Sequence, residues 1–452
     1  MKTVITYGVF DLFHEGHVNL LRRAKELGDR LIVGVTSSQF TRQRGKLLLA
    51  DDLDTRMKNV RNCPYVDEVI LEDHYGQKIE DVQKYNVDIF VAGDDWTGNF
   101  DFLKKWCEVI YLPRTPGISS SSLREAPYPQ IKFGIIGSGR VVHKFMHEIG
   151  FVKGGLHAAR IYNPHQESAK RFAEQYPGLE TSPSPEKMFS EVDAVYIASP
   201  HETHYEYAKG ALLSGKHVLC EKPSALKKGE VSDLFETANN NHVIFMDAIK
   251  TAYAPGFIHL LSILQSGFIG EIHDIDCSFT KLVPHHLREW TDHTYGGAFT
   301  ELASYTLLPI LKLIGAENLQ IRFESLLNEN GVDIYTKTYV TGNGIMSCSK
   351  CGIGVKTEGE LIIAGTTGYI KVRAPWWQTS CFEIHHEDPG QIEYYNDDFK
   401  GFGFRYEIAE FVQRIQGWHE SDYNFTRKES EMMADLHDRF LQYRDALKKN
   451  RQ

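Results

Sequence analysis

Two stretches of the chain begin the same pattern of an apolar strand, a turn that contains glycine and then an amphipathic helix. The first covers residues 3–28, with a strand expected at 3–10 and a helix at 17–28, and the second begins with IKFGIIGSG at 131–139. After each start, strand-like and helix-like segments alternate at short intervals, which is typical of a parallel sheet covered by helices. A chain that begins this pattern twice predicts two α/β domains, each with its own sheet.

The segment EAPYPQ at 125–130 separates the two patterns, and its two prolines are typical of a linker. From IRFESLL at 321–327 onward, strand-like runs follow one another without helices, which favours an antiparallel sheet, and helices are expected again from about residue 403. A length of 452 residues fits two or three domains. We therefore predict two α/β domains at 1–127 and 130–248, and a C-terminal α+β domain with a large, mostly antiparallel sheet at 249–452.

The composition limits where the chain is expected to be located and which classes of partner it is expected to bind. A net charge of −10 gives no overall attraction to nucleic acid or to anionic membranes. No apolar run approaches the roughly 20 residues of a membrane span, and the N-terminus MKTVITYGVF lacks the layout of a signal peptide, so a cytoplasmic location is expected. The seven scattered cysteines fit a reducing compartment, and the CxxC of Cys348 and Cys351 lacks two further zinc ligands nearby, which favours ordinary cysteines.

Two histidines, His14 and His17, flank Gly16 where the first strand gives way to a helix. The start of a helix is a natural anion site, because its first N–H groups are unpaired and its dipole is positive there. Imidazoles at that place could donate to phosphate oxygens and stabilise charge at an attacked phosphorus, while Gly16 leaves room for a base or ribose. Taken alone, however, two such histidines are more often ordinary polar residues of a helix start.

The surrounding motifs favour the chemical interpretation. YGVFDLFHEGH at 7–17 resembles the HxGH signature of the nucleotidyltransferase superfamily, and RTPGISSSSLR at 114–124 resembles its second signature. Between them, residues 91–113 are similar to the corresponding part of glycerol-3-phosphate cytidylyltransferases. The resemblance covers residues 1–125 and implies a Rossmann-like nucleotidyltransferase domain, which transfers CMP from CTP to an alditol phosphate and releases pyrophosphate, assisted by Mg²⁺.

This resemblance also assigns roles to individual residues. It implies that His14 and His17 contact the phosphates, that Lys46 and Arg114 neutralise the departing pyrophosphate, and that Asp11 holds the first loop or the metal. The remaining nucleotide-binding positions that it implies are Val9, Phe10, Gly16, Asp94, Thr115, Ser119 and Ser120.

Two positions differ from that family's usual pattern. Threonine is usual where this chain has Val9, and an arginine is usual where it has Pro64, although Arg56 and Arg61 lie close in sequence. An arginine near the acceptor substrate could bind the phosphate of that substrate. These two changes therefore affect which acceptor is expected more than they affect the chemistry with CTP.

The second α/β pattern contains a glycine turn and a longer motif. GSGRVV at 137–142 offers Gly137 for a tight bend and Gly139 for close approach of a pyrophosphate, although a plain βα turn would look the same. The stretch at 198–223, which ends in CEKP, resembles the Gfo/Idh/MocA oxidoreductase family, in which the lysine of EKP faces the nicotinamide and the substrate. Residues 257–275 and 294–307 resemble the second domain of that family, so the similarity extends from 131 to about 450.

Three residues of these motifs are the predicted catalytic groups of the oxidoreductase. Lys222 follows a strand, where open α/β sheets bind ligands, and a lysine there can polarise a carbonyl or stabilise an alkoxide during hydride transfer; the plain alternative is a surface lysine. Glu301 and Tyr305 are spaced i, i+4, so both point the same way on a helix. The resemblance implies Tyr305 as proton donor or acceptor and Glu301 as a partner of the substrate or of the lysine.

The cofactor choice rests on the residue about 20 positions after the glycines, which is acidic in a usual NAD site. Here that place holds Asn163, and the first acid is Glu167, which favours NADP over NAD with Arg160 or Lys170 as phosphate partners. The full set of predicted cofactor-binding residues in this half is Gly137, Ser138, Gly139, Arg140, Val141, Asn163, Ser199, His201, His204, Glu221 and Pro223.

Fusion of these two halves suggests consecutive reactions. The hypothesis is that the C-terminal part reduces a ketose phosphate, or another phosphorylated carbonyl compound, to an alditol phosphate, which the N-terminal part activates as a CDP-alditol for capsule or cell-wall polymers. One alternative is an oxidoreductase that acts on the CDP-linked product, and another is a non-catalytic dinucleotide-binding module. The expected partners are small molecules only, with no nucleic acid and no membrane, and a dimer or tetramer of the chain is the default.

Overall fold

The computed structural model describes residues 2–43, 49, 51–74, 76–113, 131–152, 156–397, 399–417 and 424–449. By its internal contacts the chain divides into two compact units, of which the first holds Met1–Tyr128, Ile258–Phe268 and Glu393–Asp398, and the second holds the remainder. The linker expected at 125–130 lies outside the described residues. The three domain boundaries drawn from the sequence stay a prediction.

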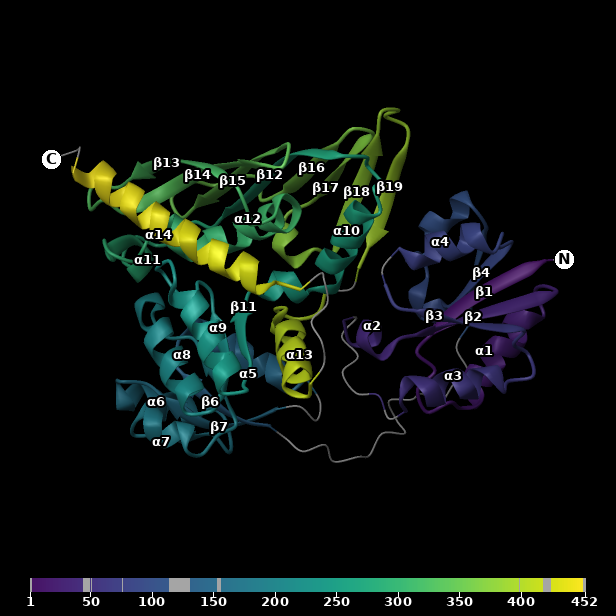
Figure 1. The fold of residues 1–452 in the computed structure, drawn as a ribbon, viewed down its shortest axis with the longest axis horizontal. Helices are drawn as coiled ribbons and strands as arrows, with labels where there is room; N and C mark the ends of the chain where they lie inside the picture. The colour runs from purple at the N-terminus through teal and green to yellow at the C-terminus, as the bar shows by residue number, and fades with distance from the viewer. Residues whose placement is uncertain are drawn as a thin grey trace. The chain divides into compact units, whose positions relative to one another are not determined.

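The first sheet contains five parallel strands in the order β3-β2-β1-β4-β5. Helices α1 and α3 cover one of its faces and α4 covers the other (Figure 1). The elements are β1 (Thr3–Gly8), α1 (Glu15–Lys25), β2 (Arg30–Thr36), α2 (Ser38–Gln43), α3 (Leu53–Arg61), β3 (Glu68–Glu72), α4 (Gln77–Lys84), β4 (Ile89–Gly93) and β5 (Glu108–Leu112).

Alternating side chains of β1 explain these two layers. Val4 packs with Leu21 of α1 and Val60 of α3, whereas its neighbour Ile5 packs with Val82 of α4 on the opposite face. All four of Val4, Ile5, Leu21 and Val60 have no exposed surface. The strand order reverses between β1 and β4, and ligands of open α/β sheets bind at such a reversal, outside the carboxyl ends of the strands. The loop that carries His14 and His17 follows β1 at this place.

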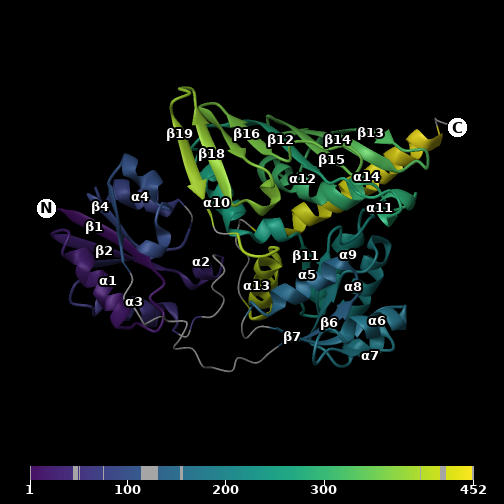
Figure 2. The same cartoon turned by 180° about the vertical axis from the view of Figure 1, so that it is seen from behind.

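The second sheet has six parallel strands in the order β11-β10-β9-β6-β7-β8, so its reversal lies between β6 and β9. Helices α8 and α9 lie side by side next to this sheet, as Figure 2 shows from behind. The elements are β6 (Ile131–Ile136), α5 (Arg140–Ile149), β7 (Leu156–Tyr162), α6 (Gln166–Ala173), β8 (Glu180–Thr181), α7 (Pro185–Phe189), β9 (Ala194–Ile197), α8 (His204–Leu213), β10 (His217–Glu221), α9 (Glu230–Asn240) and β11 (Phe245–Ala248).

The third sheet has eight strands in the order β13-β14-β15-β12-β16-β17-β18-β19. Its pair β12–β15 is parallel, and the other registered pairs are antiparallel. The large, mostly antiparallel sheet predicted from the sequence is therefore confirmed, and the parallel pair makes it a mixed sheet. The strands are β12 (Ile272–Thr280), β13 (Gln320–Leu327), β14 (Asp333–Gly342), β15 (Ile345–Gly352), β16 (Leu361–Gly365), β17 (Gly368–Val372), β18 (Cys381–His386) and β19 (Ile392–Asn396).

One long helix, α12 (Ala298–Ile314), packs against β12, β14 and β15 of this sheet and against α14 (Arg427–Lys449). The other helices between residues 249 and 452 are α10 (Pro255–Gln265), α11 (Arg288–Thr291) and α13 (Phe404–Ile415). Cys348 and Cys351 both lie in β15 as free thiols, and because they are three residues apart they point to opposite faces of the sheet. Within the described ranges, no helix combines the length and the apolar character needed to cross a bilayer.

Candidate active sites

The loop between β1 and α1 fixes the two histidines against each other. His14 is the N-cap of α1, and its Nδ1 accepts the backbone N–H of Gly16 at 3.1 Å. The backbone N–H of His14 in turn points at Nδ1 of His17 at 3.4 Å, and the two rings stack with centroids 3.9 Å apart. Because each Nδ1 accepts a hydrogen bond, the ring proton of a neutral imidazole must lie on Nε2. In their neutral forms both histidines therefore carry the ring N–H on Nε2, at the start of α1.

Two hydrogen bonds join the same loop to the segment before α3. Asp11 has no exposed surface, and its Oδ1 accepts the backbone N–H of Asp51 at 3.0 Å, while Oδ2 of Asp51 accepts the backbone N–H of Leu12 at 2.9 Å. Phe10 and Leu12 adopt positive φ angles of 54° and 48°. Such backbone conformations are costly for residues other than glycine, and they persist where the surroundings hold them. Asp11 thus holds the first loop, and its predicted role as a metal ligand stays a prediction.

Arg56 of α3 holds the ends of two strands. It has no exposed surface, and one guanidinium nitrogen donates to the carbonyl oxygens of Val9 at 2.8 Å and Thr36 at 2.7 Å, while the other donates to Oγ of Ser38 at 2.8 Å. The sequence offered Arg56 as a neighbour of the arginine position that Pro64 occupies. Its burial and its carbonyl partners instead make it a positioning residue for the β1–α1 loop.

Replacing Arg56 with Met should remove all three of these bonds, of which the one to Thr36 is buried and the other two are part-buried. We expect the free energy of local opening of β1 and α1 to fall by about 3 kcal/mol, since hydrogen bonds to a charged group contribute roughly 1.5–3 kcal/mol each. Hydrogen exchange of peptides from residues 3–36, followed by mass spectrometry, measures this loss. The matched control is Arg61→Met on the same helix, whose side chain is exposed and should change protection by less than about 0.5 kcal/mol. Equal protection in both variants would contradict the positioning role.

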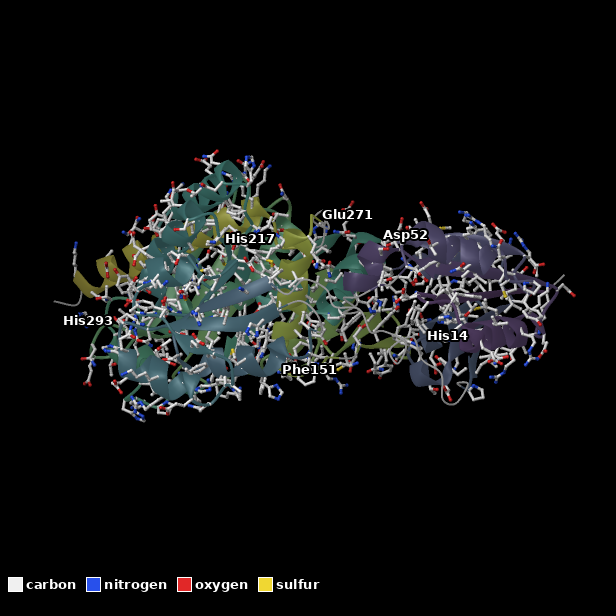
Figure 3. The ribbon with its side chains drawn as sticks, turned by 90° about the horizontal axis from the view of Figure 1, so that it is seen from below. His14, Asp52, Phe151, His217, Glu271 and His293 are labelled. Atoms are coloured by element: carbon white, nitrogen blue, oxygen red, sulfur yellow. The ribbon has the colours of Figure 1, made fainter. Side chains whose placement is uncertain are left out.

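The other predicted residues of the first site are placed only in part. Asp94 is exposed and follows β4 at the same reversal of strand order as the histidine loop, and its carbonyl oxygen accepts the hydroxyl of Thr97. Figure 3 labels His14 and Asp52, the N-cap residues of α1 and α3. The predicted residues that lie outside the described part are Lys46, Arg114, Thr115, Ser119 and Ser120.

In the second unit, the glycine turn after β6 matches its prediction in geometry. Gly137 has a φ of 106°, and a Cβ there would lie 2.4 Å from the carbonyl oxygen of Ala198, so only glycine fits. Gly139 is the N-cap of α5, and a Cβ on it would meet nothing within 4 Å. Val142 is fully buried and fills the third position of the motif. The open space over Gly139 and the start of α5 fit the pyrophosphate of a dinucleotide.

Residues around this turn tie it to β7. The side-chain amide of Asn163 donates to Oγ of Ser138 at 2.8 Å, and its Oδ1 accepts the backbone N–H of His165. Arg160 forms ion pairs with Glu180 and Glu191, and Lys170 pairs with Glu167 at 2.9 Å. Arg140 and Val141 follow the turn and are exposed, and Arg140 pairs with Glu289 at 2.5 Å.

The strand β10 brings Lys222 to the predicted catalytic helix. Its Nζ donates to the backbone carbonyl oxygen of Glu301 at 3.0 Å and lies 5.5 Å from the ring centroid of Tyr305. Residues some 80 positions apart in sequence therefore meet, as a shared site requires. The sequence predicted the side chain of Glu301 as a possible partner of the lysine; in the structure the backbone of Glu301 takes this contact, and its Oε1 lies 3.9 Å from Nδ1 of His201.

Burial sets the protonation states of this cluster. It raises the pKa of Tyr305 well above its usual value, and the nearby carboxyls of Glu221 and Glu407 raise that pKa further. Burial also raises the pKa of Glu301 and of Glu221, although the Lys222 ammonium opposes both shifts. Glu221 accepts the hydroxyl of Tyr196 at 2.7 Å. A phenol that keeps its proton beside an ammonium group can donate that proton to a developing alkoxide.

His204 joins the two strand ends that border this cluster. Its Nδ1 lies 2.8 Å from the carbonyl oxygen of Pro223 and its Nε2 lies 2.8 Å from that of Ser199. Burial lowers the pKa of His204, while the two carbonyl oxygens oppose this shift. His201 is largely, though not fully, buried, and this burial lowers its pKa well below the usual value. His204 is thus a structural bridge between Ser199 and Pro223.

Helix α14 positions the start of α12 through a buried ion pair that the sequence analysis missed. Arg444 pairs with Asp333 at 3.2 Å and donates to the carbonyl oxygen of Gly296 at 2.6 Å, and Asp333 accepts the backbone N–H of Phe299 at 2.7 Å. Gly297 has a φ of 116°, and a Cβ there would collide with Asp333. This contact holds the helix that carries Glu301 and Tyr305. The two adjacent glycines before the helix, Gly296 and Gly297, were the feature of the sequence that could have indicated this close contact with Asp333.

His437 of α14 packs edge-to-face on Phe299 and should make folding sensitive to pH. Burial lowers its pKa to about 4, whereas an unfolded histidine has a pKa near 6.5. Between those values the unfolded chain binds a proton that the folded chain excludes, so stability is full above about pH 6.5 and falls as the pH drops toward 4. From pH 7 to pH 5 the expected loss is about 2 kcal/mol.

Thermal unfolding of the wild type and of His437→Leu at the two pH values measures this contribution. The midpoint of the wild type should fall further between pH 7 and pH 5 than that of the variant. Parallel decreases would contradict the assignment to His437.

Metal binding finds limited support in the side chains. Within the residues that the structure describes, no group of three or more His, Cys, Asp or Glu side chains could hold a metal ion.

Comparison with known proteins agrees with the geometry of both candidate sites. Residues 5–126 match the cytidylyltransferase-like family model, and residues 131–248 match the model of an oxidoreductase family with an NAD-binding Rossmann fold. The glycerol-3-phosphate cytidylyltransferase of Bacillus spizizenii is 53% identical over 125 residues, which are 28% of this chain and 96% of that protein. The trans-1,2-dihydrobenzene-1,2-diol dehydrogenase of Danio rerio is 25% identical over 324 residues, covering 68% of this chain and 95% of that protein.

Solved structures show the fold of the second half. A variant of KijD10, a 3-ketoreductase from Actinomadura kijaniata in complex with TDP-benzene and NADP, aligns with a TM-score of 0.61 at 22% identity over 69% of this chain and 96% of that chain. The UDP-N-acetylglucosamine 3-dehydrogenase GnnA from Acidithiobacillus ferrooxidans aligns with a TM-score of 0.58 at 21% identity over 69% and 98%. The chain is therefore a bifunctional enzyme in which a cytidylyltransferase domain of the glycerol-3-phosphate cytidylyltransferase type precedes a Gfo/Idh/MocA oxidoreductase.

Proposed function

We propose that the enzyme makes a CDP-alditol in two steps, reducing a ketose phosphate to an alditol phosphate and then transferring CMP to it from CTP. The observation that carries the first step is the meeting of Lys222, Glu301 and Tyr305 at the end of β10. The second step rests on the stacked pair of His14 and His17 and on the similarity to glycerol-3-phosphate cytidylyltransferases. Consecutive reactions give a physical reason for the fusion, because one active site supplies the other.

In the proposed reduction, bound NADPH would supply a hydride to the carbonyl carbon of the substrate. Lys222 stabilises the negative charge that develops on the oxygen, and the hydroxyl of Tyr305 donates the proton that completes the alcohol. The proposed cofactor is NADP, because Asn163 stands where an NAD site usually has an acid. The lining that fits the dinucleotide is the turn of Gly137, Ser138 and Gly139 with the start of α5.

In the proposed cytidylyl transfer, a phosphate oxygen of the alditol phosphate attacks the α-phosphorus of CTP. The new P–O bond forms as the bond to the β-phosphate breaks, and pyrophosphate leaves. Nε2–H of His14 and of His17 would donate to the phosphate oxygens, with Lys46 and Arg114 as the cations for pyrophosphate. Mg²⁺ bound to the triphosphate would supply further charge neutralisation. Catalysis consists of positioning and electrostatic stabilisation, because no protein nucleophile is needed.

The test is to incubate the full chain with CTP, Mg²⁺, NADPH and a panel of three-, five- and six-carbon ketose phosphates. Mass spectrometry should detect a CDP-alditol in one mixture only when both CTP and NADPH are present. Adding CTP and the matching alditol phosphate without NADPH should give the same product. If reduction occurs only after a CDP-linked compound has formed, the order of reactions is the reverse, and if no CDP-linked product forms at all, the proposal fails.

A further inference from the structure

Helix α11 carries two adjacent residues of opposite charge, and each forms an ion pair with a residue that follows a strand of the second sheet. Nη2 of Arg288 lies 2.5 Å from Oε2 of Glu202, and Oε1 of Glu289 lies 2.5 Å from Nη2 of Arg140. The paired residues are 86 and 149 positions apart in sequence. Asp292, at the end of the same helix, also accepts from Arg288 at 2.9 Å. Helix α11 is therefore joined by charge to two distant parts of the dinucleotide-binding fold.

The two partners of α11 lie on either side of the reversal of strand order in the second sheet. Arg140 is the first residue of α5 and follows β6 through the glycine turn, and Glu202 lies in the short 3-10 helix η3 (His201–Thr203) after β9. Strands β6 and β9 are the neighbours between which the order reverses. A dinucleotide binds in the crevice outside the carboxyl ends of such strands, with its pyrophosphate at the start of the first helix. Helix α11 thus connects the two edges of the crevice in which the coenzyme is expected.

Further contacts tie this arrangement to the helix that carries the predicted catalytic residues. The backbone N–H of Gly297, the N-cap of α12, donates to the carbonyl oxygen of Glu289 at 3.0 Å. On the other edge of the crevice, Nδ1 of His201 lies 3.9 Å from Oε1 of Glu301 in α12. Both edges are therefore fixed relative to α12, directly or through α11.

We infer that α11 is a positioning element of the coenzyme site, in which Arg288 and Glu289 hold Glu202 and Arg140 at the two edges of the crevice and thereby slow the release of NADPH. The inference rests on the proposed coenzyme. The side chain of Arg140 is 68% exposed, so its other guanidinium donors can reach the pyrophosphate while Glu289 fixes the group. Arg288 and Glu289 act only through their partners and are positioning residues.

Release of NADPH from the full chain tests this role without any carbonyl substrate. Enzyme loaded with NADPH is mixed with excess NADP⁺ in a stopped-flow instrument, and the fluorescence of the reduced coenzyme is followed. Glu202→Gln and Arg288→Met should each increase the release rate about 3- to 5-fold, the upper range for loss of a partly exposed ion pair. Arg288→Lys keeps the charge and should restore most of the slow release.

The direction of the two effects separates positioning from simple attraction of the coenzyme phosphates. One variant removes an acid and the other removes a cation, so long-range attraction alone would make Glu202→Gln release NADPH more slowly and Arg288→Met release it faster. Positioning predicts faster release in both, and no further increase when the two are combined, because they break the same pair. Slower release in Glu202→Gln would therefore overturn the inference, as would additive effects in the double variant.

Breaking both ion pairs should have a larger effect than breaking one. Arg288→Met combined with Glu289→Gln should increase the release rate about 9- to 25-fold, because the two pairs hold different edges of the crevice. The matched control is Glu324→Gln, which breaks the exposed pair of Arg322 and Glu324 on β13 and should release NADPH at the wild-type rate.

Failure of this inference can be distinguished from failure of the proposed coenzyme. If the wild type binds NADPH and all α11 variants release it at the wild-type rate, the positioning role is wrong and the proposed coenzyme stands. If the folded wild type binds no NADPH, the proposed coenzyme is wrong and the positioning role with it. The thermal unfolding midpoints of the variants should stay close to that of the wild type, since partly exposed ion pairs contribute little to folding.

Discussion

Replacing Lys222 with Met should lower kcat for NADPH oxidation by about 10³-fold, which is within the range expected when a positioned acid–base group is lost. The ammonium of Lys222 lies between the Glu301 carbonyl oxygen and the ring of Tyr305, so methionine removes the charge that stabilises a developing alkoxide. Stopped-flow absorbance of NADPH with the ketose phosphate found in the panel measures the effect. CTP turnover by the same variant should stay at the wild-type rate.

A matched control for that experiment is Lys227→Met, which removes the same charge from an exposed lysine five residues later. Its kcat should equal that of the wild type. A Lys222→Met enzyme with undiminished NADPH oxidation would exclude the lysine from the chemistry and support the alternative of a dinucleotide-binding module without catalysis.

The second large effect is expected for cytidylyl transfer, at the site that contains His14. His14→Asn should lower the rate of cytidylyl transfer by about 10²- to 10³-fold, because a preformed donor to the phosphates is lost. Asparagine is among the best N-cap residues, so the start of α1 should survive the substitution. Release of pyrophosphate measures the rate, and hydrogen exchange of residues 15–25 checks the helix.

NADPH oxidation should be unchanged in His14→Asn and provides its internal control. If the variant transfers CMP at the wild-type rate, His14 serves only as a helix cap, which is the plain alternative for a histidine at this position. If helix protection falls together with activity, the loss reflects folding rather than chemistry.

The sequence predicted the sheets and the principal motifs because their signals are local. Glycine turns, apolar strands and the spacing of Glu301 and Tyr305 are visible within short windows, and the structure places them as expected on strand ends and on α12. Even so, the first helix begins at Glu15 rather than at residue 17 and ends at Lys25 before the predicted Gly28. Its start moves earlier because the His14 ring accepts the N–H of Gly16, an interaction that hydrophobic periodicity cannot reveal.

The roles of residues that depend on long-range contacts could not be predicted from the sequence. Arg56 looked like a candidate for substrate binding, but its partners Val9 and Thr36 lie 47 and 20 residues away and can be recognised only after folding. Glu407 lies in FRYEIAEFV, where a glutamate is usually expected to face solvent, yet its side chain has no exposed surface. The contact of Lys222 with the backbone of Glu301 likewise depends on how β10 and α12 meet.

Isothermal titration calorimetry can decide whether one polypeptide carries two independent nucleotide sites. CTP with Mg²⁺ and NADPH should each bind the full chain once, and saturation with one should leave the affinity for the other unchanged within error. His14→Asn should weaken only CTP, because its side chain lies in the first unit. Mutual displacement of the two nucleotides, or the absence of heat from both in folded protein, would contradict the account.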